Sequence, residues 1–464
     1  MFGLFAPRPP LETLEQAWIE RRLGDVARQF GPERLGLGDA PAEGQLKPSE
    51  AMGGTRSTED VDRLFARLVD RLGPAPVTPT LAWYDGDAHL STDKNAIPVP
   101  RSAIADPPTL GAALVRGACR RMHFGEGEAD LRAVDLVATA LGCGLFLCLA
   151  DAPEAAAPGD RGLTSREIGY ALALLWHVRQ EAGGASSDPP WLGELRGDAA
   201  AAVTGGLKYL RKAGDARFTA ASLRDSSPPT EAAVRKELHH KRPARRLAAV
   251  WDAAQLPDRE SRTPGVESAT LLGLLETLHD REPAVRAASA EALGRLCPNA
   301  AADRETWDRV LLGLIGATED TLAAVRAAAL RGLAAAPDLG EAEAAREELD
   351  RVVLAGLAAR TPAVRSAAAA VATRLPPVPA EAGGLREEPF APAVLKALVG
   401  ALVRCDDAEA AGHVATLRAL HPDPAALAEE RVDDDELLSR VLDALGDAPL
   451  AAPEPEPEPV GAAE

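Results

Sequence analysis

Four stretches in the second half of the chain share one pattern of small apolar residues around a single Arg. They begin at Pro243, Pro283, Ala323 and Pro362, so consecutive copies start about 40 residues apart. A fixed period of this length is typical of a solenoid, in which helical pairs stack and bury a continuous core. Each Arg-bearing helix should follow an outer helix, and a fifth, atypical pair should close the array. We expect the outer helices over residues 230–240, 266–279, 304–316 and 344–358, and the fifth pair over 391–404 and 407–420.

The first half of the chain lacks this repeat and predicts a mixed but mostly helical region. A Pro-rich stretch over residues 73–108 contains short β-prone pieces such as TLAWY, which predict two or three short strands. Elsewhere apolar residues recur at helical spacing. The expected helices cover residues 11–30, 59–72, 109–150 (two helices), 164–182 and 197–213.

Charge and hydropathy narrow the class of partner. The 464 residues carry a formal net charge of −19, which disfavours binding to nucleic acid or to an anionic membrane. The longest uncharged apolar run, Leu136–Ala150, is shorter than the roughly 20 residues that span a bilayer. We therefore expect a buried core helix there. The N-terminal residues lack the basic and apolar segments of a signal peptide, and we expect no membrane association.

The cysteines and the basic residues indicate a compartment and a source. Five Cys are scattered along the chain without a C-x-x-C pair, as expected for reduced, buried thiols in a cytoplasmic protein. Arg outnumbers Lys by 44 to 7, which suggests a GC-rich bacterial genome. The cysteines are Cys119, Cys143, Cys148, Cys297 and Cys405.

The repeated stretches resemble the HEAT-repeat family. The resemblance rests on DREPAVR (Asp280–Arg286), DTLAAVR (Asp320–Arg326) and TPAVR from Thr361, each followed by small apolar residues and Leu. In that family, an Asp and an Arg bond between neighbouring repeats and form a ladder along the stack. The ladder is partial here, because His240 and Ala359 stand where the first and fourth repeats would carry the Asp. The resemblance implies structural inter-repeat roles for Asp280, Asp320, Arg246, Arg286, Arg326 and Arg365.

Three segments of the N-terminal half carry a second resemblance. They are VDLVATALGCGLFLCLA (Val134–Ala150), REIGYALALLWHV (Arg166–Val178) and the stretch Pro189–Asp215. Together they are similar to a group of uncharacterised bacterial zincin-like proteins, over about the first 215 residues. In that group an H-E-x-x-H helix holds zinc, since residues four apart share one helix face and the Glu activates the bound water.

The metal motif itself is lost in this chain. The matching positions read Arg116-Gly117-Ala118-Cys119-Arg120, and Leu131 stands at the position of the third ligand. Because two cations repel a metal ion, the resemblance implies a zincin-like pseudoenzyme without zinc or peptidase activity. A replacement site would need ligands whose spacing fits no metal template, and we expect no metal. Those candidates are Cys119, His123, Glu126, Glu128 and Asp130.

A basic cluster at the start of the repeats is a candidate for partner binding. HEAT-like solenoids include DNA glycosylases with a concave basic face, but this cluster is local and the protein is acidic. A solvated edge of the first repeat, or a site that docks an acidic partner, is the preferred interpretation. The cluster consists of Arg235, Lys236, His239, His240, Lys241, Arg242, Arg245 and Arg246.

The expected fold class is mostly α. A right-handed α-solenoid of HEAT-like helical pairs follows an α+β, predominantly helical, zincin-like domain. The acidic, Pro-rich end of the chain cannot bury apolar surface and should be disordered. The expected parts are the zincin-like domain over 1–215, a linker over 216–229, the repeats over 230–420, a terminal helical cap over 421–448 and the tail over 449–464.

These patterns predict a non-enzymatic interaction or scaffold protein that binds a protein partner through the solenoid surface, without a cofactor. The chain has no G-x-S-x-G, no P-loop and no G-x-G-x-x-G motif. Two alternatives remain open at this point. One is a metal-dependent hydrolase with a rearranged site, and the other is a nucleic-acid-binding solenoid.

Overall fold

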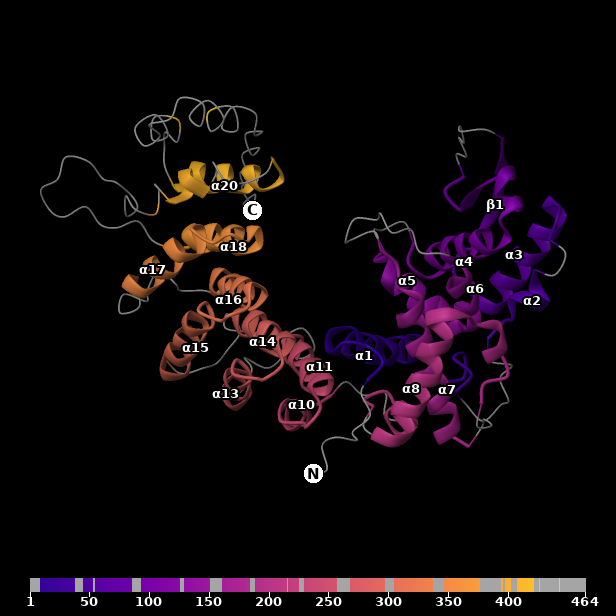
Figure 1. Cartoon of the computed structure of the whole chain (residues 1–464), viewed down its shortest axis with the longest axis horizontal. Coiled ribbons are helices and arrows are strands. Elements are labelled where there is room, and N and C mark those ends of the chain that lie inside the picture. Colours follow the sequence, from indigo (N-terminus) through magenta and orange to yellow (C-terminus); the bar gives the residue numbers. More distant parts are fainter. Residues whose placement is uncertain are drawn as a thin grey trace, which may run out of the picture. The chain divides into compact units, whose positions relative to one another are not determined.

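The fold is seen in a computed structural model of the chain (Figure 1). Contacts divide the chain into two compact units, which are described separately. The N-terminal unit comprises residues 1–229 and 240–248, and the solenoid unit comprises residues 230–239 and 249–464. The structure describes residues 9–37, 45–52, 55–85, 93–125, 129–150, 161–183, 188–214, 216–224, 229–256, 268–296, 304–336, 346–375, 397–401 and 407–420, with the single residues 394, 425 and 442.

The N-terminal unit is mostly helical, as the sequence predicts, and its helices surround one apolar core. Trp191, Tyr170 and Phe146 are among the largest fully buried side chains. Helices α7 and α8 lie against each other at two glycines, since a Cβ on Gly169 or Gly206 would meet atoms of the facing helix within 3 Å. The helices are α1 (Thr13–Phe30), α2 (Pro48–Ala51), α3 (Thr58–Leu72), η2 (Arg101–Ala105), α4 (Pro107–His123), α5 (Leu131–Ala138), η3 (Thr139–Cys143), α6 (Gly144–Leu149), α7 (Ser165–Glu181), η4 (Leu192–Glu194), α8 (Gly197–Ala213) and α9 (Ala220–Arg224).

Two short strands accompany these helices, within the stretch where the sequence predicts two or three. Strand β1 (Thr80–Tyr84) pairs in parallel with β2 (Ala96–Pro100), with Thr80 opposite Ala96. Ile97 and Val99 of β2 are buried in the core of the unit. The strands therefore belong to the same core as the helices.

The long apolar run is a kinked core helix. Residues Leu131–Leu149 are long and apolar enough to cross a membrane, but 78% of the window is buried inside the unit. Gly142 interrupts the run with φ = 99°, a conformation that side chains other than glycine rarely adopt. The carbonyl oxygen of Gly142 accepts a hydrogen bond from the backbone N–H of Leu46 at 2.8 Å. The run is thus held as part of the interior, as the sequence predicts for Leu136–Ala150.

Residues 216–224, which the sequence assigns to a linker, pack into the N-terminal unit. Ala216 and Phe218 are buried in its core. The backbone N–H of Arg217 donates to Oε2 of Glu20 at 2.7 Å, and the hydroxyl of Tyr170 donates to Oε1 of the same carboxylate at 2.8 Å. Because the residues around Phe218 are small and polar, the sequence does not indicate that this segment packs into the core. The remaining described linker residue is 229.

The solenoid unit consists of helical pairs in two layers (Figure 1). One layer holds α14, α16, α18 and α20 as successive neighbours, and the other holds α13, α15 and α17. Within a pair, α13 contacts α14, α15 contacts α16 and α17 contacts α18. The bounds agree with the periodic pattern of the sequence. They are α10 (Glu231–Leu238), α11 (Pro243–Ala253, of which residues 243–248 belong to the N-terminal unit), α13 (Ser268–Thr277), α14 (Pro283–Leu296), α15 (Arg304–Ala317), α16 (Ala323–Ala335), α17 (Arg346–Leu357), α18 (Pro362–Ala372) and α20 (Asp407–Leu420).

Small residues bring consecutive repeats into backbone contact. A Cβ added to Gly294 would come within 3 Å of three backbone atoms of Gly332. A Cβ on Gly332 would in turn collide with the carbonyl oxygen of Ala290. Helices α14 and α16 therefore touch along their backbones, and the fully buried Leu293 and Leu296 fill the adjoining space.

The end of the array is described only in part. Helix α20 is the second member of the predicted fifth pair, and residues 397–401 belong to its first member. The predicted cap over 421–448 lies outside the described residues except for 425 and 442, and the predicted tail over 449–464 lies outside them entirely. The right-handed turn of the solenoid stays a prediction.

Candidate functional site

The arginine that recurs in each repeat makes the same contact four times. Its Nη1 donates to the backbone carbonyl oxygen six residues earlier, in the turn between the two helices of the pair. The distances are 2.8 Å for Arg246 to His240, 2.8 Å for Arg286 to Asp280, 2.8 Å for Arg326 to Asp320 and 3.1 Å for Arg365 to Ala359. A charged donor satisfies a carbonyl that the turn leaves free, which fixes the angle between the paired helices.

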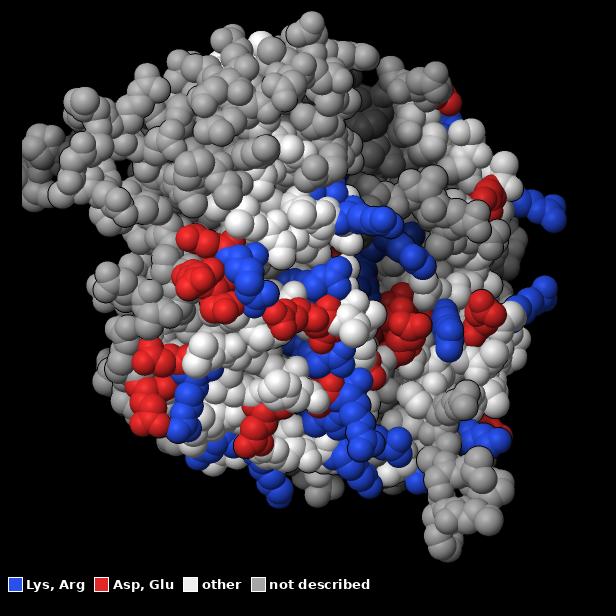
Figure 2. All heavy atoms as spheres, turned by 60° about the vertical axis from the view of Figure 1, so that its left-hand side comes forward, with Lys and Arg blue, Asp and Glu red and all other residues white. Residues whose placement is uncertain are grey.

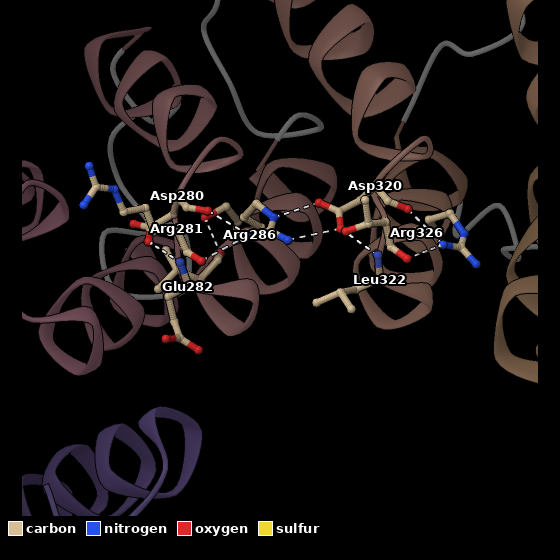
Figure 3. Close-up of polar contacts among 10 residues, drawn as sticks. Asp280, Arg281, Glu282, Arg286, Asp320, Leu322 and Arg326 are labelled. Atoms are coloured by element: carbon tan, nitrogen blue, oxygen red, sulfur yellow. Dashed lines mark hydrogen bonds and ion pairs between the residues drawn. The ribbon is translucent and has the colours of Figure 1, made fainter. Parts of the chain in front are cut away.

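One of these arginines also joins two repeats. Arg286 donates from Nε to Oδ2 of Asp320 at 2.7 Å and from Nη2 to Oδ1 at 3.1 Å, a bidentate pair (Figure 3). The hydrogen bond from Arg286 lowers the pKa of Asp320 below its ordinary value, and the same bond raises the pKa of Arg286. Oδ1 of Asp320 also accepts from the backbone N–H of Leu322 at 2.9 Å. This Asp therefore holds its own turn and the preceding repeat together.

Asp280, Arg326 and Arg365, also assigned to the ladder, each make hydrogen bonds within their own repeat. Oδ1 of Asp280 accepts from the backbone N–H of Glu282 at 2.8 Å. Arg326 and Arg365 bind carbonyl oxygens of their own repeat, the latter also that of Arg360 at 2.9 Å. At the position of the missing Asp, Ala359 offers only its backbone. The inter-repeat bonding that the family implies is thus seen for Arg286 with Asp320.

The structure contains further polar contacts between repeats that the sequence pattern did not predict. Nε of Arg331 on α16 donates to Glu291 on α14 at 3.0 Å, and Nη2 of Arg351 on α17 donates to Glu319 at 2.9 Å. The partners are 40 and 32 residues apart in the sequence. Such pairs can be predicted only when it is known which residues of consecutive repeats lie side by side. These exposed pairs add little stability individually but fix the register of the stack.

The residues of the basic cluster fall in both units. Arg235 and Lys236 lie on α10 in the solenoid unit, whereas residues 240–246 lie in the N-terminal unit. Arg235 pairs with Glu231 at 3.8 Å, and the guanidinium of Arg242 lies 5.6 Å from the ring centroid of Tyr209. Arg245 and Arg246 are partly buried, and Lys236 and Lys241 are exposed. The role of the cluster in partner binding stays a prediction.

Acidic and basic side chains are interspersed on the face of the molecule that Figure 2 shows. Ion pairs such as Arg309 with Glu305 and Arg331 with Glu291 place charges of opposite sign next to each other. A nucleic-acid site needs a basic stripe that follows the phosphates. The described residues of this face provide no such stripe.

In the N-terminal unit, Arg116, which the sequence resemblance assigns to a lost metal motif, forms an ion pair. Arg116 on α4 donates from Nε to Oδ1 of Asp135 at 2.7 Å and from Nη2 to Oδ2 at 3.0 Å. Asp135 on α5 is fully buried and also accepts from the backbone N–H of Leu163 at 2.9 Å. Burial raises the pKa of Asp135, and the hydrogen bonds from Arg116 oppose that rise. A guanidinium thus neutralises this buried carboxylate.

The neighbouring motif positions, Gly117 and Leu131, are packed against the core. A Cβ on Gly117, where the zincin-like group has its catalytic Glu, would lie 3.1 Å from two carbons of Ile97. Leu131 begins α5 and is packed against the core. No cluster of three or more metal-ligating His, Cys, Asp or Glu occurs among the described residues.

The replacement ligands considered from the sequence do not assemble a metal site in the described residues. Burial raises the pKa of Cys119 well above its ordinary value, which favours the neutral thiol. His123 lies edge-on to Phe30 with ring centroids 5.0 Å apart, and burial lowers its pKa. Asp130 caps α5 through the backbone N–H of Arg132. Residues 126–128, with both candidate Glu, lie outside the described part.

Comparison with known proteins identifies the repeat. A family model described as "HEAT repeat" matches residues 271–300, which include most of α13 and all of α14. A search of curated proteins finds no match. One solved chain is described under "Structural Basis of Tubulin Recruitment and Assembly by Microtubule Polymerases with Tumor Overexpressed Gene (TOG) Domain Arrays". It is 11% identical with a TM-score of 0.32, over 87% of this chain and 100% of that one, and at this score the likeness carries no weight.

Proposed function

We propose that this protein is a non-enzymatic scaffold whose solenoid unit binds a protein partner. The observation that carries the proposal is the HEAT repeat at residues 271–300, continued by pairs that repeat the same Arg-to-carbonyl contact. Stacked repeats present a long surface formed by side chains that the stacking does not consume. The degenerate zincin-like character of the N-terminal unit and a cytoplasmic location, which the free thiols of Cys119 and Cys143 favour, belong to the same proposal.

Exposed side chains between the stacked arginines are the candidates for recognition. Two large apolar residues of the solenoid unit are exposed, Leu312 on α15 at 61% and Leu322 before α16 at 44%. Neither contributes to the buried core, so both can change without loss of fold. Leu14 on α1 of the N-terminal unit, exposed at 53%, offers a matched control.

Affinity capture of the full chain from its native host tests the proposal. We expect a stoichiometric partner that the double variant Leu312→Glu with Leu322→Glu loses about 10-fold, because charges on an apolar contact cost more than about 1.4 kcal/mol. Leu14→Glu should retain it. Absence of any partner, or a partner lost with Leu14→Glu alone, would contradict a solenoid interaction surface.

Neither alternative gains support from the geometry. For a metal-dependent hydrolase with a rearranged site, stoichiometric zinc in the purified protein would be the supporting result. A nucleic-acid-binding solenoid would need a continuous basic face instead of interspersed charges.

A further inference from the structure

We propose that a hollow between the third and fourth repeats binds a carboxylate of the partner, supplied by an Asp or Glu side chain. The third repeat is α15 with α16, and the fourth is α17 with α18. Arg326 and Ala359 both line this hollow, which measures about 260 Å³. Ala359 stands where the preceding repeat has Asp320. The hollow therefore lies at the junction between repeats where the Asp of the Asp–Arg ladder is missing.

The preceding junction shows how such a guanidinium takes a carboxylate. Nη1 of Arg286 is fixed by the carbonyl oxygen of Asp280 at 2.8 Å, which leaves the edge formed by Nε and Nη2 facing the next repeat. That edge receives both oxygens of Asp320 at 2.7 and 3.1 Å. The contact is the fork geometry that matches a planar carboxylate.

Arg326 repeats the first half of this arrangement. Its Nη1 donates to the carbonyl oxygens of Asp320 at 2.8 Å and Thr321 at 3.1 Å, as in the copy before it (Figure 3). Among the described residues, no acceptor engages its Nε and Nη2. Arg326 is partly buried, and its guanidinium is already held from one side. A ligand that binds the other side therefore removes little further conformational freedom from the side chain.

The rest of the hollow suits an aliphatic side chain that ends in a carboxylate. Leu330, Val352 and Val364, all buried, form apolar walls. At the rim, Arg351 pairs with Glu319 at 2.9 Å, and both side chains are more than half exposed. Arg351 also pairs with Glu348 at 2.7 Å, so it offsets only part of the charge of these two carboxylates, and the attraction for an incoming anion comes from Arg326.

A carboxylate fits better than a phosphate of a nucleic acid. The edge of one guanidinium offers two parallel donors, which a single carboxylate satisfies completely. A polyphosphate gains affinity from many cations along a track, whereas this protein has a net charge of −19 and mixed charges on the face shown. The proposal therefore specifies an acidic protein segment.

The test uses the full chain and follows the Nε–Hε NMR signal of Arg326, assigned by its loss in Arg326→Lys. The probe is N-acetyl-glutamate methylamide, with N-acetyl-glutamine methylamide as its uncharged counterpart. We expect a saturable shift with the glutamate compound only. Arg326→Gln should weaken binding about 10-fold, followed on the amides of α16, because it removes a charge-assisted pair.

The decisive variant is Ala359→Asp, which supplies the missing carboxylate from within the chain. It should move the Arg326 signal without ligand and abolish the response to the glutamate compound. Arg309→Gln, an exposed Arg outside the hollow, should leave that response unchanged. No saturable shift, an unchanged response in Ala359→Asp, or a shift caused only by a short oligonucleotide would each overturn the proposal.

The choice of an acidic partner segment rests on the proposed scaffold function, but the two can fail separately. If capture recovers a partner that Ala359→Asp retains fully, the hollow is not the recognition site and the scaffold function stands. If no partner is recovered while the glutamate compound still shifts Arg326, the carboxylate site stands and the scaffold function fails.

Discussion

The two units each contain a bidentate pair between an Arg and an Asp, and the pairs differ in their surroundings. In both, Nε lies 2.7 Å from one carboxylate oxygen and Nη2 lies 3.0 or 3.1 Å from the other. Asp135 is fully buried, whereas the side chain of Asp320 is 14% exposed. Burial raises the pKa of Asp135, but Arg286 lowers the pKa of Asp320. One geometry thus serves to neutralise a buried charge in the first unit and to join repeats in the second.

The largest effect should follow from breaking the buried pair. Arg116→Leu leaves the carboxylate of Asp135 buried without its cation, and loss of one partner of a buried pair costs about 3–5 kcal/mol of unfolding free energy. Hydrogen exchange should accelerate in α4 and α5. The exchange of α14 and α16 should stay unchanged, because they belong to the other unit.

The double variant Arg116→Leu with Asp135→Leu is the control for that prediction. Replacing both charges by apolar groups removes the unpaired carboxylate, so most of the lost stability should return. If the single variant were as stable as the parent chain, Asp135 would not depend on Arg116. The buried Arg–Asp pair of the first unit would then not stabilise that unit by neutralising Asp135.

An intermediate effect should follow from separating the repeats at their backbones. Gly332→Val places a branched side chain against the carbonyl oxygen of Ala290, and overpacking of this kind costs about 3 kcal/mol. Denaturant unfolding and exchange in α14 and α16 measure it. Equal stability of Gly332→Val and the parent would show that α14 and α16 can shift apart freely.

Gly316→Ala on α15 is the matched control for the Gly332 substitution. No atom lies within 4 Å of a Cβ added there, so the change tests helix propensity alone. It should stabilise the solenoid unit by up to about 1 kcal/mol. A destabilised control would mean that loss of any glycine, not backbone contact, explains Gly332→Val.

The sequence predicts the pair Arg286–Asp320 of the solenoid unit more completely than the buried pair Arg116–Asp135. The 40-residue period places Arg286 and Asp320 at equivalent turns of adjacent repeats, so their contact follows from register alone. Arg116 and Asp135 belong to different helices of a region without a repeat. The sequence singles out Arg116 as a position of the lost metal motif but assigns no role to Asp135, and only the tertiary fold shows that the two bond to each other.

Other features depend on how elements meet and are invisible to periodicity. Gly332 follows the same alanine-rich pattern as its neighbours, and its close approach to the Ala290 carbonyl cannot be predicted from that pattern. Phe218 anchors a segment whose composition predicts a linker. The substitution at Ala359 is evident in the sequence, but the hollow beside Arg326 depends on the spacing of α16 and α17.

The smallest expected effect concerns the pH dependence of the partly buried Arg286–Asp320 pair. The folded pKa of Asp320 lies below its ordinary value of 3.8, so folding favours the ionised form. Its contribution is therefore fully present above that pH and is lost as pH falls through the lower folded pKa. For Asp135 the sign is reversed, because a raised folded pKa makes its ionisation oppose folding as pH rises from 3.8 through the folded value.

Asp320→Asn isolates this effect, because the amide oxygen can still accept from the N–H of Leu322 while the charge is removed. We expect the variant to be about 1 kcal/mol less stable at pH 7 and to converge on the parent only as pH falls below 3.8 through the lowered folded pKa of Asp320, where the folded parent also loses its charge. Denaturant unfolding of the solenoid unit across this range measures the difference. Glu305→Gln, which removes an exposed in-helix pair on α15, should change stability by less than about 0.5 kcal/mol at either pH. A constant difference between Asp320→Asn and the parent at all pH values would show that Asp320 acts through its shape, and the two Arg–Asp pairs would no longer differ in the sign of their pH dependence.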